Sequence, residues 1–252
     1  MNKVLADILE TGAAKTANGS GSVKIHSSIS SAEGQFLQKL IRQADPTVSL
    51  EVGLAYGISA LFICDALNVR NGTQHIAIDP NQHGGPWGNT WDGVGIANLR
   101  RAGYGDIVRL IEAPSYRALA ALEGSGQRVG FAFIDGWHTF DFTLVDLFFI
   151  DRMLNVGGVV AFDDADWPAI RKVCRFVKTN LAYSVLHGDD LVDDRKSLKR
   201  RLSEGLLRRS PFRRLLRPEA IQSDFSLGLA GSCIAFRKEA DDSRRWDHFV
   251  EF

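Results

Sequence analysis

The stretch Thr47-Val48-Ser49-Leu50-Glu51-Val52-Gly53-Leu54-Ala55-Tyr56-Gly57 decides the fold of this chain of 252 residues. A short apolar run ends in an acidic residue and is followed by a turn with two glycines. Apolar residues then recur at helical spacing over residues 58–69. Strand, glycine turn and helix in this order form half of a mononucleotide-binding unit. The sequence therefore predicts an α/β fold built around this turn.

The spacing of the glycines bears on the ligand. It reads G-x-A-x-G, unlike the G-x-G-x-x-G pattern that seats a diphosphate on a helix N-terminus. Glu51 would repel a phosphate, but it can accept hydrogen bonds from an ammonium or amide group. S-adenosylmethionine, with a cationic amino acid end and no phosphate, suits this arrangement. Small residues at such a turn also serve close backbone packing alone, so the turn by itself leaves both interpretations open.

Further apolar runs alternate with helical patterns along the chain. Helices are expected at 31–45, 94–102, from 115, and at 140–154, where Gly157 and Gly158 close the last of them. Strands are expected at 75–78, 107–111, 129–134, 159–162 and 233–236. This alternation predicts a doubly wound, mostly parallel sheet.

Composition favours one domain over residues 1–252, because 45% hydrophobic content supports one large core. We expect an N-terminal extension at 1–30, with residues 13–24 as a loose link, and a basic helical insertion at 188–231. Lys+Arg and Asp+Glu balance at 30 each, so net charge gives no general argument for nucleic acid or membrane. The sequence leaves open whether the protein forms a homo-oligomer.

Three widely separated cysteines, Cys64, Cys174 and Cys233, argue against a disulfide framework or a zinc cluster. A reducing cytoplasm is therefore predicted. Residues 1–12 are charged and amphipathic without a continuous apolar core, so we expect neither a secretory signal nor a membrane span there.

The basic segment 195–217 interleaves arginines and lysines with leucines, as in an amphipathic basic helix or helical pair. It could contact an anionic carrier, a lipid surface or nucleic acid, form an oligomer contact, or cover the substrate. A solvated face above a packed apolar stripe explains the same pattern.

Carboxylates follow two of the predicted strands, with Asp135 after one and Asp163 and Asp164 after another. If both strands neighbour the first, the three carboxylates converge beside the glycine turn, and a divalent cation would relieve their repulsion. Oxygen ligands indicate Mg²⁺ first, then Mn²⁺ or Ca²⁺. His138, three residues after Asp135, could take a proton from a metal-held hydroxyl. Alternatively, Asp163 and Asp164 only begin the loop into a helix at Pro168.

Other candidates lie at the same sheet edge. Asp79, about twenty residues past the turn, matches the acidic position that takes ribose hydroxyls, or else caps a loop. Ser115 is a plausible helix N-cap. The loop 81–93 carries Trp87 and Trp91, which either cover a ligand or pin the loop to the core.

The ordered motifs of residues 30–187 resemble class I S-adenosylmethionine-dependent methyltransferases. These motifs are Leu-Glu-Val-Gly-x-x-x-Gly, Ile-Asp-Pro, Trp-x-Gly-Val-Gly-x-x-Asn-Leu-x-x-Ala-Gly, Ile-Asp-Gly-x-His and Gly-Gly-x-x-x-x-Asp-Asp. Within that class the chain is most similar to the metal-dependent O-methyltransferases of the catechol type and those acting on macrolide sugars.

The resemblance implies a seven-stranded sheet of the Rossmann-like methyltransferase fold, and it implies roles for named residues. His138 would be the base beside Asp135, and Asp135, Asp163 and Asp164 would hold the metal. The implied cofactor contacts are Glu51, Gly53, Ala55, Tyr56, Gly57, Ser59, Asp79, Ser115 and Asp135. Catechol-type enzymes usually carry Asn in place of Asp164 and a lysine near His138, and this sequence has neither. The departure favours an aliphatic or sugar hydroxyl on a small or glycosylated metabolite.

Two other functions use the same sheet. One is a nucleotide-dependent oxidoreductase, which the missing glycine and Glu51 disfavour. The other is a non-methylating or binding member of the fold, held to an anionic partner by residues 195–217.

Overall fold

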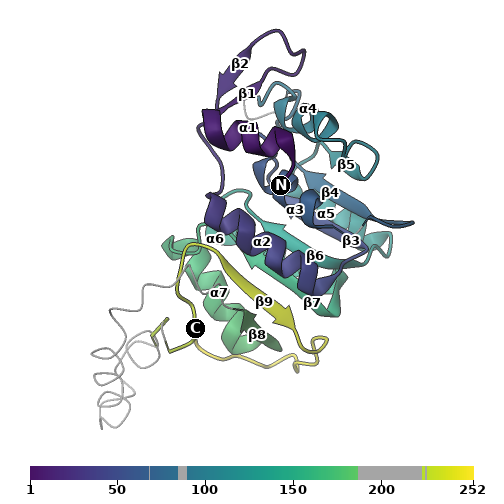
Figure 1. Cartoon of the computed structure of the whole chain (residues 1–252). Helices are drawn as coiled ribbons and strands as arrows, with labels where there is room; N and C mark the ends of the chain where they lie inside the picture. The colour runs from purple at the N-terminus through teal and green to yellow at the C-terminus, as the bar shows by residue number, and fades with distance from the viewer. Residues whose placement is uncertain (68, 85–89, 187–222, 225) are drawn as a thin grey trace.

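A computed structural model describes residues 1–67, 69–84, 90–186, 223–224 and 226–252 (Figure 1). Its main sheet has seven strands in the order β5-β4-β3-β6-β7-β9-β8. Strands β3 to β7 pair in parallel, and β9 runs antiparallel to both β7 and β8. The predicted doubly wound, mostly parallel sheet is confirmed. The strands are β3 (Val48–Val52), β4 (Gln74–Ile78), β5 (Val108–Ile111), β6 (Val129–Ile134), β7 (Leu154–Phe162), β8 (Tyr183–Leu186) and β9 (Ile234–Lys238).

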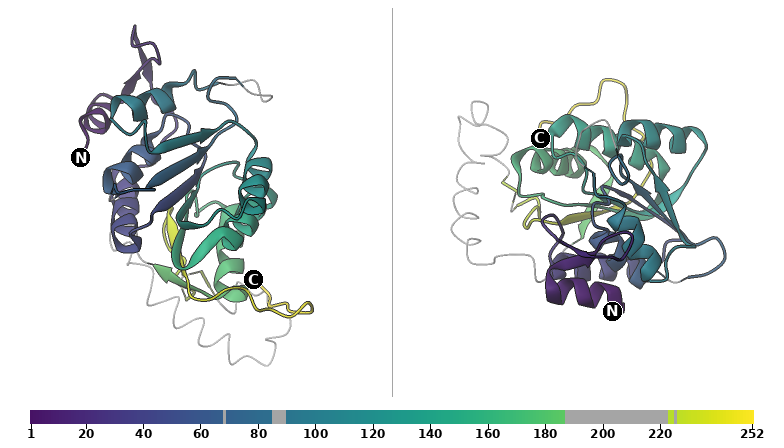
Figure 2. Two further views of the ribbon diagram at one scale, coloured as in Figure 1. Left: turned by 90° about the vertical axis from the view of Figure 1, so that its right-hand side faces the viewer. Right: turned by 90° about the horizontal axis from the view of Figure 1, so that it is seen from above.

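Helices cover both faces of this sheet (Figure 2). One layer holds α1 (Lys3–Thr11), α2 (Ser31–Ala44), α3 (Ile58–Ala66) and α4 (Val94–Arg101), and the other holds α5 (Ser115–Gly124), α6 (Phe140–Met153) and α7 (Pro168–Asn180). Alternation along β6 supplies both cores: Phe131 and Phe133 face the first layer, and Ala132 and Ile134 face the second. Burial on both faces explains why the strands are continuous apolar runs.

Helix α2 shows how the sequence sets the approach to β3. Its N-cap Ser30 accepts a hydrogen bond from the Glu33 N–H, while the Glu33 carboxylate accepts one from the Ser30 N–H. The helix ends where Asp45 takes a left-handed conformation before Pro46. The chain then enters β3 at the predicted place.

The prediction of a loose link over residues 13–24 is wrong. These residues form an antiparallel hairpin of β1 (Ala13–Lys15) and β2 (Ser22–Lys24). Ala14 is buried, and the guanidinium of Arg101 on α4 donates hydrogen bonds to the carbonyls of residues 15, 16 and 17. Because these contacts come from a helix distant in sequence, local composition did not reveal them.

The structure confirms a helix near 140–154 and a strand over 159–162, but the prediction that Gly157 and Gly158 close the helix is wrong. Strand β7 begins at Leu154 and passes through both glycines. Leu154 pairs with Val129, and the register shifts before the next pairs. Gly157 has φ 84°, so it allows the chain to bulge there.

The basic segment 195–217 lies outside the described residues, as does most of the predicted insertion 188–231. The division of the chain into an extension, one domain and an insertion therefore stays a prediction. Among the described residues, no helix has the length and apolar content needed to cross a membrane.

Candidate active site

The glycine turn lies where the strand order reverses, between β3 and its neighbours β4 and β6. Ligands of open α/β sheets bind at such a switch point. Gly53 has φ 91°, and a Cβ there would lie 1.9 Å from the carbonyl oxygen of Asp135. Gly57 also has a positive φ, of 78°, and so does Ala55, of 45°. The turn thus lets the ends of β3 and β6 approach closely.

A cavity of about 460 Å³ opens beside this turn. Of the predicted cofactor contacts, it is lined by Gly53, Ala55, Tyr56, Ser59, Asp79, Ser115 and Asp135. Glu51 and Gly57 do not line it. The fully buried Glu51 accepts a hydrogen bond from the Ser59 hydroxyl at 2.8 Å, so it lies beneath the cavity wall.

Asp79 is buried at the end of β4 and organises the turn from the side. Its Oδ2 accepts hydrogen bonds from the N–H groups of Leu54 and Ala55 and from the Gln82 side chain. Its Oδ1 accepts a hydrogen bond from the Asn81 N–H. The carboxylate therefore holds the glycine turn in shape, and its predicted contact with ribose stays a prediction.

Two aromatic contacts fix the mouth of the cavity. Trp91 packs against Tyr56 with ring centroids 5.1 Å apart, and the Tyr56 hydroxyl lies 2.6 Å from Nε2 of His26. Trp91 is half-buried, so this part of the loop is pinned to the core. Trp87 lies outside the described residues.

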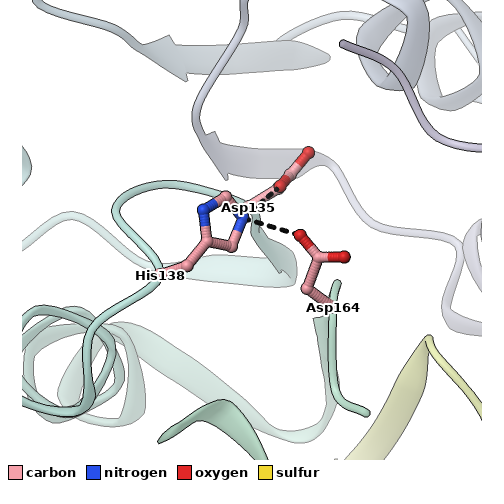
Figure 3. Close-up of side chains that lie close together, drawn as sticks. All are labelled: Asp135, His138 and Asp164. Carbon is pink, nitrogen blue, oxygen red and sulfur yellow. Dashed lines mark hydrogen bonds and ion pairs between the residues drawn. The ribbon is translucent and has the colours of Figure 1, made fainter. Parts of the chain in front are cut away.

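Asp135, His138 and Asp164 converge at the carboxyl ends of β6 and β7 (Figure 3). Nε2 of His138 lies 3.3 Å from Oδ1 of Asp135 and 2.9 Å from Oδ2 of Asp164. Their side chains are 25%, 32% and 36% exposed in that order, so a ligand can reach them. Asp164 has φ 47°, a left-handed conformation that Asp tolerates.

The electrostatics of this cluster follow from burial and proximity. Burial raises the pKa of Asp135 to about 6, although its hydrogen bond with His138 acts in the opposite direction. That same hydrogen bond is the main cause that raises the pKa of His138. Burial also raises the pKa of Asp164, and the charge of His138 lowers it. The imidazolium thus offsets part of the repulsion between the two carboxylates.

Asp163 is not one of the three clustered residues. Its carboxyl group is only 8% exposed, whereas Asp164 next to it faces the cluster. Burial, together with the charges of Asp135 and Glu33, raises the pKa of Asp163 to about 8. Its assignment as a metal ligand, and that of His138 as a base, stay predictions.

The raised pKa of Asp163 predicts a pH-dependent stability. The unfolded chain releases this proton near the ordinary value of 3.8, and the folded chain holds it to about 8. The free energy of unfolding should therefore fall between these pH values, by up to about 1.4 kcal/mol per pH unit. Urea denaturation in EDTA at pH 5 and 8 should show a smaller loss for Asp163→Asn than for the wild type. Equal losses would contradict the burial of an ionisable Asp163.

Ser115 is the first residue of α5, and Pro114 holds the N-cap position. The predicted N-cap role is therefore wrong. The Ser115 hydroxyl instead hydrogen-bonds to Asp146 of α6, a carboxyl group whose pKa burial raises to about 6. No side-chain hydrogen bond caps the start of α5.

Several cavity residues were not predicted. Residues 27–29, between the hairpin and α2, line the cavity, as do Trp137 and Phe142. Trp137 directly precedes His138, so its place at the cavity could have been predicted from the sequence. Residues 27–29 carried no such signal, because only the packing of the N-terminal hairpin brings them to the turn.

Comparison with known proteins bears on this site. Residues 50–165 match the family model described as a methyltransferase domain. The matched segment contains the glycine turn, Asp79 and the clustered Asp135, His138 and Asp164, whereas residues 27–29 lie before it.

Two curated relatives of this chain are named as methyltransferases. Caffeoyl-CoA O-methyltransferases of Eucalyptus globulus and Eucalyptus gunnii are each 26% identical over 144 residues, which is 55% of this chain and 52% of the relative. The chain spans about half the length of these curated relatives. The predicted resemblance to class I S-adenosylmethionine-dependent O-methyltransferases is confirmed.

Solved structures share the fold. The O-methyltransferase from Bacillus cereus in complex with SAH is 16% identical, with a TM-score of 0.59 over 94% of this chain and 92% of that one. TomG from Streptomyces achromogenes, in complex with SAM, is 17% identical, with a TM-score of 0.54 over 63% and 73% of the two chains. At these identities the likeness supports the methyltransferase fold.

Proposed function

We propose that this protein is an S-adenosylmethionine-dependent, divalent-metal-assisted O-methyltransferase that acts on a hydroxyl group of a small or glycosylated metabolite. One observation carries the proposal: Asp135 and His138 line the cavity beside the glycine turn, and Asp164 forms a cluster with them. The names of the Eucalyptus relatives support oxygen as the methyl acceptor.

The cavity fits the proposed cofactor in shape and charge. Gly53 leaves no room for a side chain at the wall, and the apolar Val52, Leu54 and Ile78 line the same space. Glu51 lies beneath the wall, and its charge contributes to the raised pKa of Asp135, so its field reaches the site. A cationic amino acid end is favoured next to this buried carboxylate.

The donor set fits a divalent cation. The ligand atoms of Asp135, His138 and Asp164 all lie within 4.8 Å of one another. Carboxylate oxygens suit Mg²⁺ or Mn²⁺, and His138 is proposed to take the proton and not to bind the ion. Asp163, the third predicted ligand, is adjacent in sequence and is influenced by the charge of Asp135. We propose that all three aspartates contribute to holding the ion.

When bound, S-adenosylmethionine supplies an electrophilic methyl group and the cation acidifies an acceptor hydroxyl. The residues of this chain would orient the reactants and accept the proton that leaves the hydroxyl group. The Nε2–H of His138 is shared between Asp135 and Asp164, and the other ring nitrogen points away from both carboxylates (Figure 3). His138 in its neutral form would accept the hydroxyl proton. The carboxylates fix the ring position.

Binding and turnover test this function separately. Isothermal titration should show SAH binding to the wild type, and labelled S-adenosylmethionine should transfer methyl to at least one member of a panel of catechols, caffeoyl esters and glycosides. EDTA should reduce turnover at least about a hundredfold, and Mg²⁺ or Mn²⁺ should restore it. Absence of SAH binding would contradict the proposed function. Full turnover in EDTA would show that the reaction does not need a metal ion.

The finer predictions concern the acceptor and the setting of the enzyme. We propose a sugar or aliphatic hydroxyl as acceptor. Catechol-type enzymes usually carry Asn at the position of Asp164 and a lysine near that of His138, and this chain has neither. The three cysteines are free and buried, which supports the proposed reducing cytoplasm. A homo-oligomer, and a surface contact through residues 195–217, remain predictions.

A further inference from the structure

A line of buried polar side chains runs beneath the glycine turn. Oγ of Ser49 lies 2.9 Å from Nδ1 of His75, and Oε1 of Glu51 lies 3.2 Å from Nε2 of the same ring. Oε2 of Glu51 then accepts the hydrogen bond from Ser59, which lines the cavity. Ser49, Glu51 and His75 are each 0% exposed.

The sheet register creates this line. Ser49 of β3 and His75 of β4 are paired directly. Glu51 follows Ser49 by two residues and so shares its face of the sheet. Ser59 reaches this face from α3, which packs on the same layer. No short sequence motif contains the four residues, because two strands and a helix bring them together.

Hydrogen-bond roles follow from what each group can donate. A carboxylate only accepts, so Ser59 O–H donates to Glu51, and Nε2–H of His75 is the donor available to Oε1. Nδ1 of His75 then accepts from Ser49 O–H. Among the described residues, neither Glu51 Oε1 nor His75 Nε2 has a hydrogen-bond partner. The 3.2 Å approach between these two buried atoms is therefore read as an ion-pair contact.

A hydrolytic Ser-His-Glu arrangement is excluded by burial. A nucleophilic serine must meet its substrate, and Ser49 is fully enclosed between strand and helix layers. The line reaches the cavity only at Ser59. The buried side chains can therefore affect a ligand only through the Ser59 oxygen.

We propose that His75 is a positioning residue for the cationic amino acid end of the cofactor. It holds Glu51 as a fixed carboxylate, which accepts the hydrogen bond of the Ser59 hydroxyl and so leaves the lone pairs of the Ser59 oxygen turned towards the cavity. An ammonium group is the matching donor. This inference rests on the proposed function, because it assigns one end of the same cofactor.

Two ligands separate this role from general packing. SAH carries the amino acid end, and 5′-methylthioadenosine lacks it. By isothermal titration, His75→Leu should weaken SAH binding about tenfold, the size of one charge-assisted hydrogen bond. Binding of 5′-methylthioadenosine should change less than about twofold. His75→Gln, which keeps an N–H donor at similar reach, should recover most of the SAH affinity.

Ile76→Val is the matched control, since the next residue of β4 faces the opposite core. It should leave the ratio of the two affinities unchanged. Equal weakening of both ligands by His75→Leu would overturn the inference and make His75 a packing residue. If the wild type binds neither ligand, the proposed function itself fails.

A measurement on the wild type covers the case in which His75→Leu does not fold. ¹⁵N-histidine spectra should show one slowly exchanging ring in the Nε2–H form, absent from His75→Gln. Its Nε2–H signal should shift with SAH and stay in place with 5′-methylthioadenosine. An Nδ1–H ring, or equal shifts with both ligands, would overturn the inference.

Discussion

Gly53→Ala should unfold the protein or cost it more than about 4 kcal/mol of stability. The new Cβ would lie 1.9 Å from the Asp135 carbonyl oxygen, which belongs to the backbone and cannot rotate away. The ends of β3 and β6 would have to separate, and the wall of the cavity would separate with them. Urea denaturation should reveal the loss, and any folded variant should bind SAH poorly.

Gly126→Ala isolates the cost of the backbone conformation. Gly126 also has a positive φ, of 77°, yet a Cβ there meets nothing within 4 Å. That change should cost only about 1–2 kcal/mol, the penalty for a left-handed residue. Similar losses at the two positions would show that the close approach of β3 and β6 does not matter for stability.

Asp135→Asn should reduce methyl transfer about a hundredfold to ten-thousandfold, the range spanned by a positioned acid-base group. The substitution keeps the shape of the side chain, but it removes a negative charge beside His138 and one proposed ligand of the cation. Mn²⁺ binding, followed by electron paramagnetic resonance, should weaken at least about tenfold. SAH affinity should change far less than turnover.

Asp141→Asn is the control for that change. Asp141 lies in the first turn of α6, a few residues from the cluster, and bonds to Thr139. The variant should retain turnover and Mn²⁺ binding. An Asp135→Asn enzyme that keeps more than a tenth of wild-type turnover would refute the assigned role of Asp135.

The sheet was predictable because its signal is local. Each parallel strand is buried on both faces and so appears as an apolar run, and an acidic residue marks the end of several of them. The edge that carries Asp79, Asp135 and Asp164 follows from this, since parallel strands end together. The placement of the glycine turn beside these carboxylates could therefore be predicted from the sequence.

The arrangement within the site was not predictable in the same way. Asp163 and Asp164 are adjacent and chemically identical, and the left-handed conformation of Asp164 decides which one joins His138. The partnership of Glu51 with His75 depends on the register of β3 against β4. Conformation at one residue and pairing between strands are tertiary properties, which no local pattern encodes.

Strand β9 has a consequence for how members of this fold can diversify. Because it runs antiparallel between β7 and β8, the chain leaves β8 and returns to β9 at the same edge as Asp135 and Asp164. Lengthening a connection between two fixed points costs little closure entropy, about 0.6 kcal/mol for each doubling. A connection of different length between Leu186 and Ile234 should therefore leave the paired strands, and the edge that carries Asp135 and Asp164, in place.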